Sequence, residues 1–93
     1  MRWIAEVHVQ LRPGIADPEG LTVATGLRAL GFTSVDEVRS GKLLRVGFAA
    51  DGPDQAGKLV SAMCSRLLAN PVMETATWEL RADEEPSEEA RLA

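Results

Sequence analysis

The side chains that most often do chemistry in enzymes are few in this chain of 93 residues, and the sequence does not group them. His8 is the only histidine, and Glu6 and Gln10 on the same face of a strand could form a proton relay with it. A solvated surface histidine explains this spacing better than a relay does, and no Ser-His-Asp set has support from spacing. Cys64 is the only cysteine. It lies in an apolar stripe, where burial raises a thiol pKa and leaves the group unreactive.

The segment Ser40–Lys42 contains the Gly-Lys pair of a phosphate-binding loop but lacks the rest of that motif. The motif needs a glycine five residues before the pair, where Asp36 stands, and a serine or threonine after the lysine, where Leu43 stands. We expect a tight hairpin turn here instead. Arg39 and Lys42 would flank that turn and project together toward an anionic surface of a partner.

Six elements would position these residues. Asp17 and Pro18 are typical of a helix start, and Gly31 is typical of a helix end, so a first helix is expected over about 18–30. Apolar spacing predicts a second helix between Asp51 and Asn70, where the Asn-Pro pair stops it. Alternation of apolar and polar residues predicts four strands, at Trp3–Arg12, Val35–Arg39, Leu43–Ala50 and Met73–Arg81.

The predicted order is therefore β-α-β-β-α-β, an α+β fold of ferredoxin-like type. It has a four-stranded antiparallel sheet with both helices on one face. We expect a single domain over residues 1–81 and a disordered acidic tail over residues 82–93. Leu67 lies in the middle of the apolar stripe of the second helix. The Leu67→Ala substitution is therefore expected to cost about 2–5 kcal/mol.

Charge and composition exclude several partners. Residues 1–81 hold nine basic and nine acidic side chains, and the tail carries the net charge of −4. A neutral body with an acidic tail has no field to hold a phosphate backbone, and the open sheet face lacks aromatic residues for base stacking. No apolar run reaches the roughly 20 residues of a membrane helix. We therefore expect no nucleic acid or membrane partner, no secretion signal, and a cytoplasmic location.

Two stretches of the chain, 11–46 and 63–80, carry a set of short motifs in a fixed order. They are Arg-Pro-Gly, Asp-Pro-Glu-Gly, Leu-Gly-Phe, Val-Arg-Ser-Gly-Lys and Leu-Leu-Ala-Asn-Pro-Val. Together they resemble the PurS family, the small subunit of phosphoribosylformylglycinamidine (FGAM) synthase in purine biosynthesis. Ser40 departs from the pattern, because the family has a hydrophobic residue there.

The resemblance implies a subunit without catalytic groups, cofactor or metal of its own. It would form dimers or tetramers and join a large synthetase subunit and a glutaminase subunit. The assembled ligase would use ATP, Mg and glutamine to amidate formylglycinamide ribonucleotide, and the small subunit could help ammonia pass between the other two. We expect docking through residues of two loops: Arg12, Pro13, Gly14, Asp17, Pro18, Arg39, Gly41 and Lys42.

Two other functions are compatible with the predicted fold. A dimeric domain of the same type could sense a small molecule bound between its protomers. An independent enzyme of acylphosphatase type would need an arginine in a phosphate-binding loop and an asparagine nearby. Arg12 precedes a Pro-Gly loop, but Asn70, the only asparagine, is expected at the far end of a helix.

Overall fold

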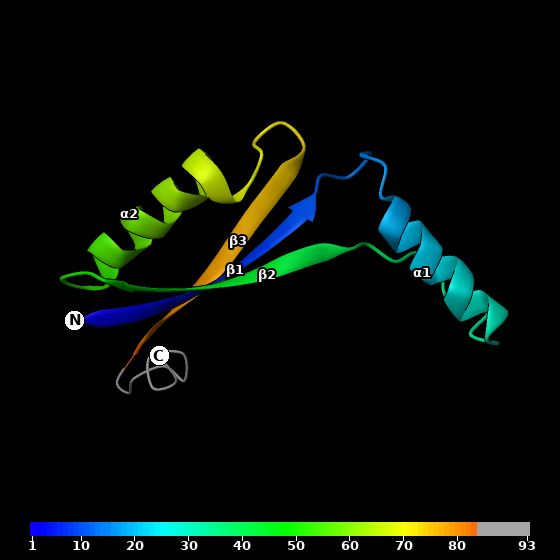
Figure 1. The fold of residues 1–93 in the computed structure, drawn as a ribbon, viewed down its shortest axis with the longest axis horizontal. Coiled ribbons are helices and arrows are strands. Elements are labelled where there is room, and N and C mark those ends of the chain that lie inside the picture. Colours follow the sequence, from blue (N-terminus) through cyan, green and yellow to red (C-terminus); the bar gives the residue numbers. More distant parts are fainter. Residues whose placement is uncertain (84–93) are drawn as a thin grey trace, which may run out of the picture.

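A computed structural model describes residues 1–83, and its secondary structure consists of three strands and two helices. The acidic tail expected over residues 82–93 lies almost entirely outside the described residues. The strands form one antiparallel sheet in the order β2-β1-β3, so β1 lies in the centre (Figure 1). The elements are β1 Arg2–Leu11, α1 Pro18–Ala29, β2 Gly41–Ala49, α2 Pro53–Met63 with a π-helical continuation η1 Cys64–Leu68, and β3 Glu74–Ala82.

The core lies between the sheet and α2. Ala5, Val7 and Val9 project from one face of β1 and are buried, as the alternation of the sequence predicts. Val60 and Cys64 close the same cluster from the helical side. This part of the expected α+β architecture is confirmed, because the central strand is apolar on the face that α2 covers.

The expected fourth strand and the expected hairpin are both wrong. Residues 35–39 form no strand, and the chain runs through Ser40 directly into β2. A tight two-residue hairpin needs positive φ angles in its turn. Among the described residues only Gly14 and Gly31 have a positive φ, so Ser40 and Gly41 do not form such a turn. Gly41 is paired with Gln10 as the first residue of β2, so it is part of the sheet and not of a turn.

We expected the first helix to cover one face of the sheet, but it does not. α1 and the returning segment 31–40 project from one end of the sheet and form an arm (Figure 1). The start and end of α1 are as predicted: Asp17 caps it, and Gly31 with φ of 101° closes a Schellman motif in which the Phe32 N–H donates to the Leu27 carbonyl at 3.0 Å. The local signals were therefore correct, but they do not determine where the finished helix packs.

Leu67 was expected in the core but is 83% exposed. The reason is the wide turn η1, in which the Ala69 N–H donates to the Cys64 carbonyl five residues back at 3.1 Å. A π-turn advances the helix more slowly than an α-turn, so the positions after Cys64 rotate relative to the sheet. Leu68 packs against the core in place of Leu67.

Candidate functional site

A buried carboxylate, Asp17, joins the two ends of the arm at the point where they leave the sheet. Its Oδ1 accepts hydrogen bonds from the Gly20 N–H at 2.9 Å and from the Ser40 hydroxyl at 2.6 Å. Its Oδ2 accepts the Ser40 N–H at 2.6 Å. The carboxylate therefore caps α1 and at the same time holds the segment that leads into β2. We call Asp17 and these partners the Asp17 clasp.

The same contacts change the acidity of Asp17. The Ser40 hydroxyl, the Gly20 N–H and the Ser40 N–H all stabilise the ionised form, and together they lower the pKa of Asp17 from 3.8 to about 2. Burial opposes this shift, and the Arg39 guanidinium, with its Nε 3.9 Å from Oδ2, adds a smaller lowering effect. The clasp is therefore charged at neutral pH.

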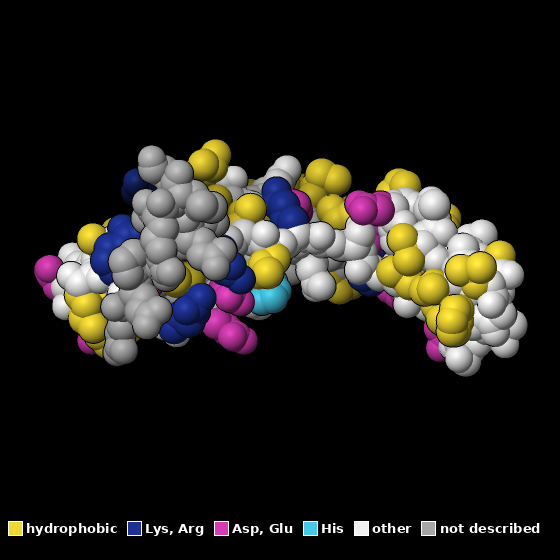
Figure 2. Space-filling view, turned by 60° about the horizontal axis from the view of Figure 1, so that its bottom comes forward, with side chains coloured by type: hydrophobic (Ala, Val, Ile, Leu, Met, Phe, Trp, Pro, Cys, Tyr) yellow, Lys and Arg dark blue, Asp and Glu magenta, His cyan; other side chains and the backbone are white. Residues whose placement is uncertain are grey.

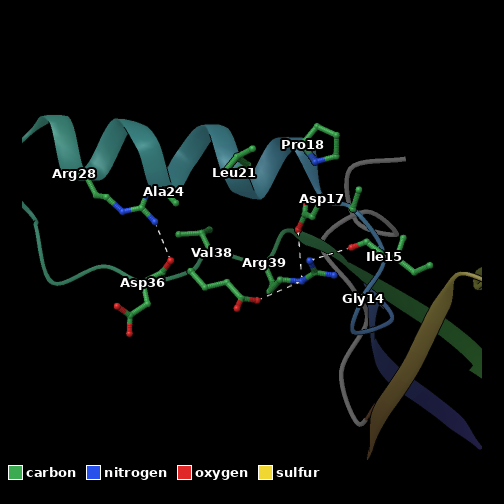
Figure 3. A pocket seen from close by; sticks show the side chains of 12 residues that line it. Gly14, Ile15, Asp17, Pro18, Leu21, Ala24, Arg28, Asp36, Val38 and Arg39 are labelled. Carbon is green, nitrogen blue, oxygen red and sulfur yellow. Dashed lines mark hydrogen bonds and ion pairs between the residues drawn. The ribbon is translucent and has the colours of Figure 1, made fainter.

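Arg39 turns toward the clasp (Figure 3). Its guanidinium donates to the Ile15 carbonyl at 3.2 Å and to the Arg12 carbonyl at 3.3 Å. The expectation that it projects together with Lys42 is thus wrong. Lys42 itself is exposed, near the start of β2.

Gly20 allows α1 to lie directly against the returning segment. A Cβ at this position would collide with the Val38 carbonyl oxygen and would lie 2.7 Å from Oδ2 of Asp17. Only a residue without a side chain permits this approach of two backbones. Gly20 was not among the predicted site residues, although Asp-Pro-Glu-Gly was one of the motifs that carried the resemblance.

We call the region where the arm meets the sheet the junction. On the side away from the clasp, Arg12 holds it to the segment before β3. Its Nε and Nη2 donate to the Pro71 carbonyl at 3.2 and 2.9 Å, and its backbone N–H donates to the Met73 carbonyl at 2.8 Å. The following turn contains Gly14, whose φ of 88° is unfavourable for any residue with a side chain. These contacts of Arg12 link the start of the predicted Arg12–Gly20 loop to the segment before β3.

A cleft of about 590 Å³ opens between α1 and the returning segment (Figure 3). Arg28 closes its outer part, since its guanidinium donates to the Val35 carbonyl at 2.9 Å and to the Asp36 carbonyl at 2.8 Å. The residues that line the cleft include Gly14, Asp17, Pro18, Leu21, Val38 and Arg39. Asp36 and Glu37 also line the cleft, so its surface is partly charged, although Asp17 and Arg39 are engaged in contacts within the chain.

The structure thus brings together six of the eight predicted docking residues and leaves two beside them. Arg12, Pro13, Gly14, Asp17, Pro18 and Arg39 belong to the junction, whereas Gly41 and Lys42 begin the neighbouring strand. Whether they bind another subunit stays a prediction. Ser40 was noted only as a departure from the family pattern, but it supplies two of the hydrogen bonds of the clasp.

The residues first considered for chemistry lie elsewhere. His8 is exposed on the sheet face opposite α2, where its strand neighbours across the sheet are Leu43 and Thr77. Cys64 is buried, and burial raises the pKa of its thiol, as predicted. Within residues 1–83 no group of three or more His, Cys, Asp or Glu side chains is placed to hold a metal ion, and no helix is long and apolar enough to span a membrane.

The fold is that of a small α+β protein in which a helical arm projects from one end of a three-stranded antiparallel sheet (Figure 1). Residues 4–82 match the family described as PurS, phosphoribosylformylglycinamidine (FGAM) synthase. The chain therefore belongs to the PurS family.

Individual relatives agree with this assignment. The PurS subunit of FGAM synthase from Archaeoglobus fulgidus is 41% identical over 71 residues, which cover 76% of this chain and 89% of that protein. Thermus thermophilus PurS is 41% identical and superposes with a TM-score of 0.80 over 92% of this chain and all of the other. A chain in the structure of PurLQS from Thermotoga maritima is 30% identical and superposes with a TM-score of 0.76, covering 89% of this chain and 99% of that one.

Proposed function

We propose that this PurS-family chain connects the synthetase and glutaminase subunits of FGAM synthase, and that it does so without catalytic groups of its own. The observation that carries the proposal is the match over residues 4–82, together with the likeness to a chain of the PurLQS structure. The ATP, Mg and glutamine would be used by the other subunits. The complex would act in the cytoplasm.

The geometry is suited to such a role. Ammonia released from glutamine must be kept from bulk water, where it is protonated and lost, so contacts between subunits have to exclude solvent. The Asp17 clasp joins the two ends of the arm, and the Arg39 hydrogen bonds join them to the loop that follows β1. A rigid junction of this kind can hold two larger subunits at a constant separation.

We propose the surface around the junction as the docking site, with Lys42 as its exposed charge. Arg39 is less suited to this role than we expected, because its guanidinium already binds two carbonyl groups of the chain. Pro13, Gly14 and Pro18 are exposed beside the cleft and could contact a partner through backbone and apolar surface.

Co-elution of the three subunits in gel filtration tests the proposal. The chain should elute with the synthetase and glutaminase subunits, and Lys42→Glu should reduce the fraction in the complex. Lys58→Glu is the matched control, because Lys58 is also exposed but lies on α2, away from the junction. Equal losses in both variants would refute docking at Lys42. Failure of the unsubstituted chain to elute with the other subunits would refute the function itself.

The two alternative functions predict other results. A sensing domain would bind glutamine or a purine intermediate saturably, which calorimetry on the isolated chain would detect. For an acylphosphatase-type site, the structure does bring Arg12 closer to Asn70 than the sequence led us to expect, since Arg12 binds the carbonyl of Pro71. However, that guanidinium is occupied by the carbonyl, and Oδ1 of Asn70 accepts the Val72 N–H at 3.0 Å, so neither is arranged for phosphate.

A further inference from the structure

A hollow of about 350 Å³ lies between the end of α2, the π-turn η1 and the edge strand β3. Its lining includes three kinds of side chain: the indole of Trp78, the hydroxyl groups of Ser61 and Ser65, and the charged groups of Arg12 and Glu74. Ligand pockets combine apolar surface with a few polar groups in this way, and their usual volumes begin at about 300 Å³. A π-turn of the kind that forms one wall is frequent at functional sites.

The two charged side chains of the hollow are anchored to the same turn, and one atom of each stays unused. Nε and Nη2 of Arg12 donate to the Pro71 carbonyl at 3.2 and 2.9 Å. Oε1 of Glu74 accepts the Asn70 N–H at 2.8 Å. Among residues 1–83, no hydrogen bond or ion pair engages Nη1 of Arg12 or Oε2 of Glu74, and the two side chains do not pair with each other. They therefore present opposite charges to one hollow from held positions.

Charged side chains on the opposite face of the sheet instead pair with one another. Figure 2 shows basic and acidic side chains together beside the histidine, and Glu6 lies 3.4 Å from Arg45 and 3.9 Å from Arg81. In the hollow, an anion alone would be repelled by the Glu74 carboxylate, and a cation alone would be repelled by the Arg12 guanidinium. A ligand that carries both charges satisfies both residues at once.

We propose that this hollow binds a free α-amino acid as its zwitterion. The carboxylate accepts hydrogen bonds from Nη1 of Arg12 and from the Ser61 hydroxyl, and the ammonium group donates to Oε2 of Glu74. One free arginine nitrogen suits a single carboxylate oxygen, although it does not give the two-pronged contact typical of phosphate sites. The Trp78 indole offers apolar surface to the side chain of the ligand. The site lies within one chain, unlike that of the alternative sensing domain, and it adds a ligand to the assembly role without replacing that role.

An NMR titration of the full chain with L-leucine, L-glutamine and glycine tests the proposal. At least one of them should shift the indole N–H signal of Trp78 saturably, with a dissociation constant of about 0.1–10 mM, as expected for so small a ligand. The indole of Trp3, which is 8% exposed and lies outside the hollow, is the internal control. The N-acetyl and the amide derivative of the amino acid that binds each lack one charge, so each should bind at least about tenfold more weakly. No saturable shift with any of the three, or equal binding of the derivatives, would overturn the proposal.

A substitution on β3 tests whether the ligand lies in the hollow. Glu74→Gln keeps the shape of the side chain but removes the charge that attracts the ammonium group, so it should raise the dissociation constant at least about tenfold. Glu79→Gln is the matched control, because Glu79 belongs to the same strand but does not line the hollow. Equal dissociation constants in the two variants would refute the site, and the derivatives still test it on the unsubstituted chain if Glu74→Gln does not fold. None of these measurements uses the other subunits, so a negative result leaves the function in FGAM synthase untouched, and failed co-elution leaves the amino-acid site untouched.

Discussion

Gly20 is the position at which the junction of arm and sheet can be tested with a single methyl group. In Gly20→Ala the new Cβ would meet the Val38 carbonyl oxygen and the Asp17 carboxylate. Crowding of a packed site typically costs about 1–3 kcal/mol. The cost at Gly20 should lie at the upper end of this range. One of the two neighbours, the Val38 carbonyl, belongs to the backbone and can move only if the returning segment moves. The better helix propensity of alanine gives back about 1 kcal/mol.

The net expectation for Gly20→Ala is a loss of about 2 kcal/mol in the free energy of unfolding. Gly26→Ala in the same helix is the control, because nothing lies within 4 Å of its Cβ. That variant should gain about 0.5–1 kcal/mol. Urea unfolding followed by circular dichroism, at one fixed protein concentration, separates the two. Equal gains in both variants would show that α1 does not lie against the Val38 backbone, and the description of the clasp would fail.

Three further predictions concern the clasp and the core. The folded pKa of Asp17, about 2, lies below the ordinary 3.8, so its stabilising effect is complete above about pH 5 and is lost as the pH falls toward 2. The difference in melting temperature between the unsubstituted chain and Asp17→Asn should therefore be largest near neutral pH and shrink below about pH 4, and a constant difference would contradict the low pKa. Arg39→Lys keeps the charge but replaces a fork whose two nitrogens donate to separate carbonyls with a single ammonium. Urea unfolding should therefore show a loss of about 1 kcal/mol, and an unchanged midpoint would mean that these bonds contribute nothing. Val60→Ala should cost about 2 kcal/mol because Val60 is fully buried, whereas Leu67→Ala should change the unfolding free energy by less than about 0.5 kcal/mol, and the reverse order would mean that η1 is placed in the wrong register.

The local signals of the sequence predicted the elements well and their packing poorly. The alternation of β1 fixed which side chains face α2, and Asp17, Pro18 and Gly31 marked the ends of α1, because these effects act within a few residues. The apolar side of α1 predicted burial against the sheet, but Val23 and Leu30 are exposed in the structure. Helical spacing shows which side of a helix is apolar and not what packs on it, because the hydrophobic effect has no direction.

The errors at residues 35–41 and at Leu67 have a similar origin. Two valines in Val35–Arg39 favour a strand, but Asp36 and Glu37 do not, and a strand forms only where a neighbour can pair with it. Ser40-Gly41 is a common turn pair, yet here Ser40 is held by Asp17, a residue 23 positions earlier in the chain. The π-turn at Cys64 leaves no mark that apolar spacing can detect. The sequence motifs identified the loop residues of the junction. They did not show that α1 lies so close to the Val38 backbone that position 20 must be glycine.

The rate of FGAM synthesis with two nitrogen sources tests the central claim most directly. Synthetase and glutaminase subunits are assayed with saturating ATP and Mg, once with glutamine and once with ammonium, each with and without this chain. We predict that the chain is required for the glutamine-dependent rate and has little effect on the ammonium-dependent rate, because it holds subunits together and contributes no reacting group. Full glutamine-dependent turnover in its absence would contradict the account.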